Sequence, residues 1–348
     1  MARLAQKLAL ALASTALGLG VIELVVASWM PQPGAPIESK LGDWGNNVHQ
    51  ASEVPGLLYE LKPGAESKYR PRNQKGGKIP VKINSYGMHG PEFEFEKRKF
   101  RRVAILGDST TFGYGVQSGQ SYSSILQTML NNRDKPTQYQ TMNFGVAGYS
   151  TKEEAIVLEH KALKFKPDAI VLGYNLNDPD GEHAGEPLYN NFAKPKWWRH
   201  SHITRYIERT MREYRIEKYA QGNLIRYWHT PGKSNWAMVE DGFVRIAELA
   251  QEAGLPVLVV LFTAGSPTND PSTYGLRDLH AQVAAEARKN GFEVLDLSIA
   301  YSRLFKEGKK TQLPHMHPNL LGQRTAADEI AKFLLGEKGA FAQGQRAQ

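Results

Sequence analysis

From about residue 100 onward, short apolar runs alternate with stretches of helical spacing. The runs predict five strands, at Arg102–Leu106, Tyr139–Phe144, Asp168–Leu172, Leu255–Phe262 and Phe292–Leu297. The helical spacing predicts helices at Tyr122–Leu130, Lys152–Phe165, Leu276–Lys289 and Gly322–Leu335. Strands that alternate with helices indicate a parallel sheet with helices on both faces. Right-handed crossovers then make the fold class α/β, as a three-layer α/β/α sandwich.

The first 30 residues have a different pattern, in which Arg3 and Lys7 precede an apolar run that extends to Ala27. A membrane-spanning helix needs about 20 mainly apolar residues. The run therefore predicts a single transmembrane helix, and the basic residues before it place the amino terminus inside and the remainder in the periplasm or outside the cell. Glu23 lies toward the outer end, where a charge costs less. The alternative is a signal peptide cleaved after Val25-Val26-Ala27, which would leave a secreted protein.

Composition divides the rest of the chain. Residues 31–100 are rich in Pro, Gly and charge and are expected to form a stalk and an irregular lead-in, with short strands such as Val81–Ile83. Residues 101–336 form the main domain, with an insertion at 179–240 as a candidate lid. Residues 337–348 are expected to be a flexible tail.

The insertion contains a predicted helix from Ile203 to Tyr219 with basic residues at spacings of three and four. They are Arg205, Arg209, Arg212, Arg215 and Lys218. The favoured interpretation is a solvated basic face. Nearby Trp and Tyr residues leave a lid or a membrane-facing element as the alternative.

Charge and cysteine content exclude several functions. The 348-residue chain has a net charge of +8, but no nucleic-acid-binding motif accompanies it, so nucleic acid is not an expected partner. It has no cysteine, which excludes disulfides, cysteine nucleophiles and cysteine-ligated zinc.

Candidate chemistry gathers where the predicted strands end. The ligand crevice of an open parallel sheet lies beyond the carboxyl ends of its strands. Ser109, in Gly107-Asp108-Ser109 after the first strand, is a candidate nucleophile, and His317, in the loop before the last helix, is a candidate base. The Gly148 N–H and the Asn177 side-chain amide, which follow the second and third strands, are candidate oxyanion donors together with the Ser109 N–H.

Competing roles exist for some of these residues. His315 and His317 have the spacing of a metal pair, but no third ligand lies nearby in the sequence, so no metal is expected. Asp108 and Asp178 are expected to bond loop N–H groups rather than to act in catalysis.

Four blocks of this sequence together resemble the SGNH/GDSL hydrolase family. They are Gly107–Ser109, Asn143–Gly148, Asn177-Asp178 and His317–Asn319, in the family's order. The resemblance implies a flavodoxin-like sheet of five parallel strands in the order 2-1-3-4-5. It also implies esterase, lipase, deacetylase or O-acyltransferase chemistry with no metal or cofactor. A Gly-x-Ser-x-Gly elbow is absent, which argues against the ordinary α/β-hydrolase fold. The lead-in at 84–90 resembles membrane-anchored members.

The chain departs from the family pattern at two places. Asn175 stands where a Gly usually precedes the block-three Asn, and Pro314 and His315 stand where an Asp usually precedes the catalytic His. That Asp normally orients the imidazole, so a backbone carbonyl or a carboxylate from another segment would have to replace it. Asp296 is one candidate, although a strand-terminal or helix-capping role is favoured for it.

Three functional hypotheses follow. The first is a serine ester hydrolase that acts outside the cytoplasm through an acyl-enzyme, on an ester or acylated-glycan substrate. The second is an O-acyltransferase that acts on envelope or secreted polysaccharide. The third, motivated by the missing Asp, is a membrane-anchored binding module with an impaired site.

Overall fold

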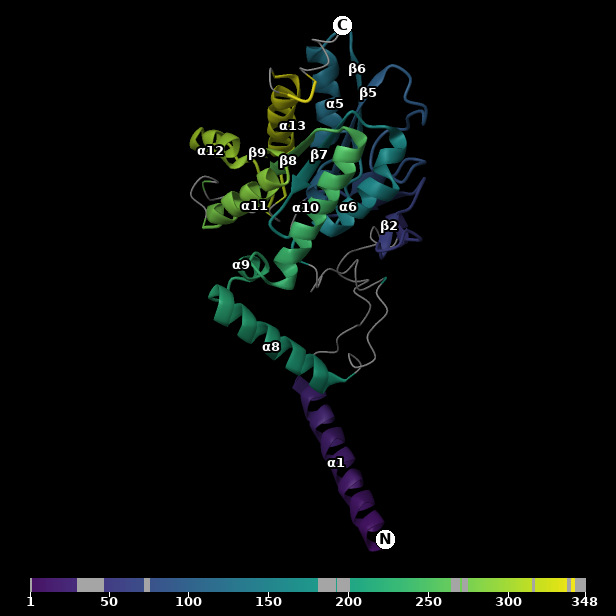
Figure 1. Cartoon of the computed structure of the whole chain (residues 1–348), viewed down its shortest axis with the longest axis vertical. Coiled ribbons are helices and arrows are strands. Elements are labelled where there is room, and N and C mark those ends of the chain that lie inside the picture. Colours follow the sequence, from purple (N-terminus) through teal and green to yellow (C-terminus); the bar gives the residue numbers. More distant parts are fainter. Residues whose placement is uncertain are drawn as a thin grey trace.

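The computed structural model describes residues 2–29, 47–71, 76–180, 192, 201–263, 270, 275–314, 317–336 and 339–341. Its main sheet has five parallel strands in the order β6-β5-β7-β8-β9, which confirms the predicted 2-1-3-4-5 arrangement (Figure 1). The strands are β5 (Phe100–Gly107), β6 (Gln138–Asn143), β7 (Ala169–Tyr174), β8 (Val257–Leu261) and β9 (Glu293–Asp296).

Helices cover both faces of this sheet, and the strands are apolar on both sides because both are buried. On one face, Ala104 and Leu106 of β5 pack in a core with α6 (Thr151–His160), α10 (Ser234–Ala253) and α11 (Arg277–Lys289). On the other face, Val103 and Ile105 pack with α5 (Tyr122–Arg133), α12 (Ser298–Lys306) and α13 (Leu320–Leu335). The three-layer α/β/α sandwich is therefore confirmed.

Two expected boundaries differ from the structure. The helix predicted over Lys152–Phe165 is interrupted at Lys161, after which the 3₁₀ turn η1 (Ala162–Phe165) follows α6. The insertion was expected to reach residue 240, but α10 begins at Ser234 and is the crossover helix between β7 and β8. Residues 234–240 therefore belong to the sandwich.

Within the expected stalk and lead-in over residues 31–100, residues 47–71 and 76–100 form a lead-in with short strands, as expected, but this lead-in packs on the sandwich instead of standing apart as a stalk. Residues 31–46 and 72–75 lie outside the described residues. Two small antiparallel sheets, β1 (His49–Ala51) with β2 (Tyr59–Leu61) and β3 (Glu66–Tyr69) with β4 (Ile79–Lys82), pack against the sandwich. The fully buried Arg102 guanidinium fixes this segment, because it donates hydrogen bonds to the carbonyls of Glu94, Phe95 and Glu96.

The expected flexible tail also differs where the structure describes it. Phe341 is only 4% exposed, and its ring packs 5.3 Å from that of Tyr139. Residues 337–338 and 342–348 lie outside the described residues.

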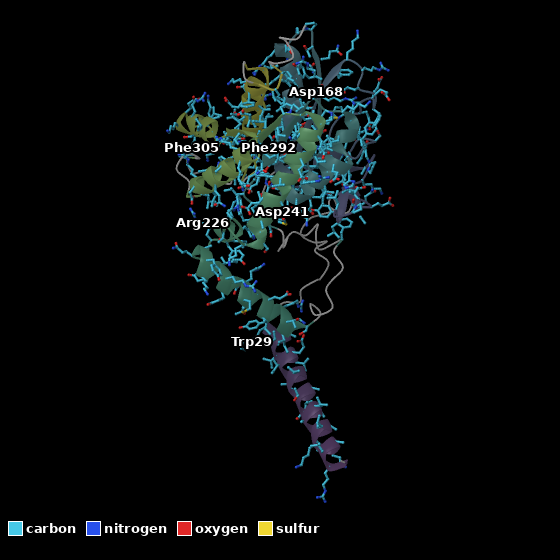
Figure 2. The ribbon with its side chains drawn as sticks, in the orientation of Figure 1. Trp29, Asp168, Arg226, Asp241, Phe292 and Phe305 are labelled. Carbon is cyan, nitrogen blue, oxygen red and sulfur yellow. The ribbon has the colours of Figure 1, made fainter. Side chains whose placement is uncertain are left out.

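The helix α1 (Ala2–Trp29) projects away from the sandwich, with Trp29 at its inner end (Figures 1 and 2). The segment Arg3–Trp29 is long enough and apolar enough to cross a membrane. A signal sequence near the amino terminus meets the same criteria. Between α1 and the sandwich lie α8 (His202–Ala220) and α9 (Leu224–Trp228) (Figure 1). The predicted helix Ile203–Tyr219 is thus present as α8.

Candidate active site

The candidate nucleophile stands on a sharp turn at the end of β5. The one-turn helix α4 (Ser109–Phe112) starts directly after the strand, and Gly113 closes it at φ 90°. Gly107, which precedes the turn at φ 149°, has no room for a side chain, because a Cβ there would lie 2.0 Å from Thr111 Oγ1. The turn leaves Ser109 half-buried at the carboxyl edge of the sheet.

Ser109 and His317 meet at this edge although 208 residues separate them. The Ser109 Oγ lies 2.7 Å from His317 Nε2, within hydrogen-bonding distance, whereas it lies 3.3 Å from Asp108 Oδ2. A hydroxyl that donates to Nε2 requires this nitrogen to be unprotonated, with the ring proton on Nδ1. The pair therefore has the geometry of a nucleophile and its base.

A buried carboxylate organises the nucleophile turn. Asp108 accepts hydrogen bonds from the Thr110 N–H (2.9 Å), Asn175 Nδ2 (2.7 Å) and Asn177 Nδ2 (3.0 Å). The expectation that Asp108 bonds a loop N–H is therefore confirmed. Asn177 itself is exposed, and Asp108 fixes the position of this candidate oxyanion donor by accepting from its amide nitrogen. Asn175, which departs from the family pattern, is a second amide that donates a hydrogen bond to this carboxylate. Sequence reasoning missed this role.

Asp178 also has a structural role, as expected. Its Oδ1 accepts from the Asn175 N–H at 3.2 Å, and its Oδ2 accepts from Thr151 Oγ1 at 3.4 Å. Asp178 thus ties the turn after β7 to the start of α6.

Buried acids behind the turn shift one another's pKa values. Burial raises the pKa of Asp108, and the pKa values of Asp178 and Glu154 are raised well above their usual range by burial and then by neighbouring carboxylates. Neither Glu154 carboxyl oxygen has a hydrogen-bond partner among the described residues. Burial without a hydrogen-bond partner among the described residues thus favours the neutral form of the Glu154 carboxyl.

The loop that carries Gly148 is fastened to the nucleophile turn at its start. Asn143 Nδ2 donates to the Thr111 carbonyl (2.8 Å), and the Val146 N–H donates to the Gly107 carbonyl (3.1 Å). Gly145 is required here because a Cβ would lie 2.4 Å from the Phe112 nitrogen. Gly148 itself adopts φ 81°, a conformation that favours glycine.

The lead-in supports the same loop from outside. Tyr59 Oη on β2 donates to the Ala147 carbonyl at 2.8 Å, next to Gly148, and Tyr149 Oη donates to the Tyr59 carbonyl. Sequence reasoning missed this pair, since neither tyrosine stands in a recognisable motif.

His317 is held by a narrow loop before α13. The Leu313 N–H donates to the His317 carbonyl (2.8 Å), and the Asn319 N–H donates to the Thr311 carbonyl (2.9 Å). Asn319 then caps α13 by accepting from the Gly322 N–H at 3.0 Å. The Tyr114 ring lies beside the imidazole, with ring centres 4.9 Å apart.

Asp296 is engaged away from His317. It accepts from the Ser298 N–H at 2.8 Å at the start of α12 and lies 3.1 Å from His280 Nδ1. Asp296 is the last residue of β9, so the strand-terminal interpretation is confirmed, whereas the N-cap of α12 is Leu297.

The remaining candidates can be placed only in part. His315 lies outside the described residues, and within the described residues no cluster of His, Cys, Asp or Glu side chains could hold a metal ion. A cavity of about 600 Å³ lies at the opposite end of the sheet, where Phe100 and Gln138 begin their strands, and so is remote from Ser109.

The parallel sheet in the order β6-β5-β7-β8-β9 with helices on both faces is the α/β fold of the SGNH hydrolases. The sequence model of the GDSL-like lipase/acylhydrolase family matches residues 105–325, well over half of the chain. The chain therefore belongs to this family, and its chemistry is that of an enzyme acting on esters.

Solved structures similar to this chain are distant in sequence. A lipolytic protein of the G-D-S-L family from Veillonella parvula is 19% identical with a TM-score of 0.42, over 68% of this chain and 99% of the other. An acetyl xylan esterase is 17% identical with a TM-score of 0.43, over 66% and 97%. A two-domain esterase active on acetylated mannans is 15% identical with a TM-score of 0.44, over 69% of this chain and half of the other. A comparison with curated proteins gave no match.

Proposed function

We propose that the protein is a serine ester hydrolase in which Ser109 is the nucleophile and His317 the general base. The single observation that carries the proposal is the 2.7 Å distance from Ser109 Oγ to His317 Nε2 at the carboxyl edge of the sheet. An impaired binding module would have no need to keep this distance. The hydrogen-bonded network around Asp108 adds to the case because it preorganises the turn that presents Ser109.

The proposed reaction has two halves. Ser109 Oγ attacks the carbonyl carbon of the ester while His317 takes the hydroxyl proton, and the carbonyl oxygen becomes an oxyanion. The Ser109 and Gly148 N–H groups and the Asn177 amide stabilise that charge. The intermediate collapses to an acyl-enzyme as His317 gives its proton to the leaving alcohol. Water, deprotonated by His317, then releases the acid and restores Ser109.

We place this reaction outside the cytoplasm, with α1 as a retained membrane anchor. The support is the length of the apolar helix, the basic residues Arg3 and Lys7 at its start, and the absence of burial along it within the described chain. A protease-protection assay on intact cells, with a tag after Gln348, tests the orientation. Protease should digest the tag once the outer membrane is permeabilised, while the inner membrane is still intact.

Labelling with a fluorophosphonate probe tests the nucleophile. The wild-type chain in detergent should be labelled, and Ser109→Ala should lose the label. Ser118→Ala is the matched control, because Ser118 is exposed and lies nine residues away on the same segment. Equal labelling of wild type and Ser109→Ala would reject the proposal.

Turnover of aryl esters of graded acyl length then tests the base. His317→Ala should lose most of the activity, because proton transfer contributes roughly 10²–10⁴-fold. Analysis of the products with and without a glycan acceptor separates hydrolysis from acyl transfer. Acylated glycan as the main product would replace the proposed hydrolysis by the O-acyltransferase alternative.

A further inference from the structure

The helix α8 carries a stripe of apolar side chains that the sandwich does not cover. Tyr206, Ile207, Met211 and Tyr214 are 52%, 53%, 46% and 58% exposed. At 3.6 residues per turn, these four positions lie on one side of the helix. We call them the α8 stripe.

Protein covers the opposite side of α8 only in part, because Arg209 and Tyr219 on that side stay exposed. Arg212 and Ile216, two positions before and after Tyr214, are only partly exposed, and positions two apart point in nearly opposite directions on a helix. Ala220 at the end of α8 is buried, and Lys233 at the start of α10 lies 4.0 Å from the centre of the Tyr219 ring. The α8 stripe therefore points away from the sandwich.

Glu23 of α1 joins the start of α8. Its carboxylate accepts hydrogen bonds from Ser201 Oγ (2.8 Å) and from the N–H groups of Ile203 (3.0 Å) and His202. The two N–H groups belong to the first turn of α8, where backbone donors lack partners within the helix and favour a negative charge. Glu23, the one acidic residue of α1, thus has hydrogen-bond partners at the start of α8. Cleavage after Ala27 would remove Glu23 and with it these bonds.

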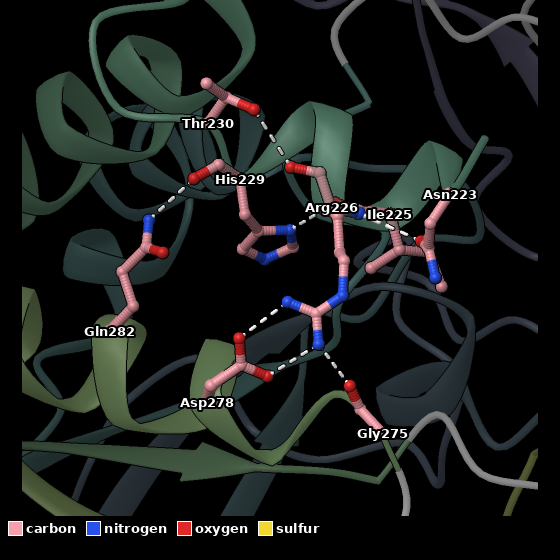
Figure 3. Close-up of polar contacts among 8 residues, drawn as sticks. All are labelled: Asn223, Ile225, Arg226, His229, Thr230, Gly275, Asp278 and Gln282. Atoms are coloured by element: carbon pink, nitrogen blue, oxygen red, sulfur yellow. Dashed lines mark hydrogen bonds and ion pairs between the residues drawn. The ribbon is translucent and has the colours of Figure 1, made fainter. Parts of the chain in front are cut away.

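The far end of α8 is fixed to the sandwich through α9. Arg226 of α9 forms an ion pair with Asp278 of α11, with Arg226 Nη1 2.6 Å from Asp278 Oδ2 (Figure 3). Gln282 Nε2 of α11 donates to the His229 carbonyl at 2.8 Å (Figure 3). The helix α8 is therefore held at both ends, by α1 at its start and by the sandwich beyond its end (Figure 1).

We propose that α8 is an interfacial helix, whose stripe lies in the headgroup region of the bilayer that α1 spans. The inference rests on the proposed retention of α1 as an anchor. The apolar run from Leu8 to Ala27 gives about 30 Å of helix at 1.5 Å per residue, close to the thickness of the hydrocarbon core, and Glu23 in its last two turns brings the start of α8 to the outer end of this run.

The composition of the stripe and its borders fits a lipid interface. Tyr206 and Tyr214 have the amphipathic rings that collect at membrane–water boundaries. Lys218 lies 5.7 Å from the centre of the Tyr214 ring, and this cation and Arg215 border the stripe where phosphate groups would lie. A bilayer containing anionic phospholipid is thus the expected occupant.

The absence of cysteine from the sequence permits a direct test with single-cysteine variants of the full chain. Leu10→Cys probes α1, Ile207→Cys probes the stripe, and Arg209→Cys is the matched control, because Arg209 is exposed but lies on another side of α8. Each variant, labelled with bimane, is reconstituted into vesicles of phosphatidylcholine and phosphatidylglycerol. Circular dichroism verifies that each is folded.

The labels should respond differently to two quenchers. Brominated lipid should quench Leu10→Cys and Ile207→Cys, the second more strongly when the bromines lie near the headgroups, and iodide in the water should quench Arg209→Cys. In addition, Glu23→Ala in the Ile207→Cys background should raise iodide quenching, because the joint between α1 and α8 is lost.

The outcomes separate the inference from its premise. If lipid quenches Leu10→Cys while iodide quenches Ile207→Cys as strongly as Arg209→Cys, the anchor stands and the interfacial helix is wrong. If none of the three is quenched by lipid, the anchor is wrong as well. The label at Ile207→Cys could be protected from iodide only when a vesicle holds more than one chain. That result would assign the stripe to a contact with a second copy and would also overturn the inference.

Discussion

The two halves of the candidate Ser–His pair are held in different ways. Ser109 follows a buried strand, and the neighbouring Asp108 accepts three hydrogen bonds from residues of two strand ends. His317 stands on a loop that is braced by backbone bonds within residues 311–319 and by the side-chain amides of Gln312 and Asn319, which donate to backbone carbonyls. The nucleophile turn is thus preorganised around a buried carboxylate, whereas the loop of the base is braced by neutral backbone and amide groups. Substitutions should therefore act through the Asp108 hydrogen bonds on the first side and through the shape of the loop on the second.

The largest effect should come from the Asp108 network. Asn177→Ala removes a proposed oxyanion donor and should lower kcat by roughly 10²–10³-fold. Asp108→Asn should have an effect of similar size, because its amide NH₂ would face the donor groups that now bind Oδ2. The measurement is kcat on a short aryl ester, with circular dichroism as the check on folding.

The double variant sharpens this prediction. If Asp108 acts through Asn177, the two substitutions together should cost much less than the product of their separate effects. Strictly multiplicative effects, or normal kcat in Asp108→Asn, would show that Asp108 does not position the amide.

A pair of glycine substitutions should distinguish the two sides. A Cβ at Gly322 would lie 2.2 Å from the Thr311 carbonyl that braces the His317 loop, and a Cβ at Gly145 would lie 2.4 Å from the Phe112 nitrogen. Both Ala variants should lose about 1–3 kcal/mol of stability through overpacking. Gly322→Ala should also lose up to about 100-fold in kcat, because a displacement of about 1 Å can cost that much.

Urea unfolding and kcat, measured on both variants, give the comparison. The network around Asp108 should resist displacement, so Gly145→Ala should keep the larger share of its kcat for the same loss of stability. A greater loss of kcat in Gly145→Ala would reverse the proposed difference between the sides.

A smaller effect is expected where the lead-in supports the Gly148 loop. Tyr59→Phe removes the bond to the Ala147 carbonyl, which should cost about 1 kcal/mol of stability and lower kcat several-fold. Tyr139→Phe is the control, since its hydroxyl bonds Asp134 far from the site and should affect stability alone. Unchanged kcat in Tyr59→Phe would confine the lead-in to a stabilising role.

The last prediction concerns stability rather than kcat, behind the Gly148 loop. Burial raises the pKa of Glu153 to about 7, although its carboxylate accepts from the Ser150 N–H and hydroxyl at the start of α6. Between the ordinary value near 4.5 and pH 7 the folded chain therefore binds a proton that the unfolded chain releases. Folding stability should fall as pH rises through this window, by roughly 3 kcal/mol in total at 1.36 kcal/mol per pKa unit.

Glu153→Gln tests that assignment. The amide keeps the size and the acceptor oxygen of the capping box but does not titrate. Its urea midpoint at pH 8 should exceed that of wild type, and the difference should shrink toward pH 5. The same pH dependence in both chains would assign the titration to another group.

The sequence predicted what depends on local pattern. The cores of β5 and β7, at Val103–Leu106 and Ala169–Leu172, are apolar throughout, which is typical of buried strands. The order of the family blocks predicted that Ser109 and His317 meet at one edge. The helix α10 was missed because Gly242 interrupts its pattern. That glycine lets α10 approach α6, since a Cβ there would lie 2.9 Å from Thr151 backbone atoms.

What the sequence did not predict depends on contacts between distant segments. Tyr59 and Arg102 stand in segments rich in charge and turns, and their bonds to Ala147 and to residues 94–96 exist only in the folded chain. Asn175 looked like a departure from a motif, yet it supplies a hydrogen bond that a glycine could not make.

The chain leaves the sheet at the end of β7 and re-enters the sandwich at Ser234, so α8 and α9 arise from the same edge that presents Ser109. The strands accordingly end on the side of the molecule from which α1 departs (Figure 1). With α1 retained in a membrane, as proposed, the edge that presents Ser109 would face the bilayer at a fixed distance from it. Substrates would be selected by how close to that surface their ester groups stand, before any contact with Ser109 discriminates among acyl chains.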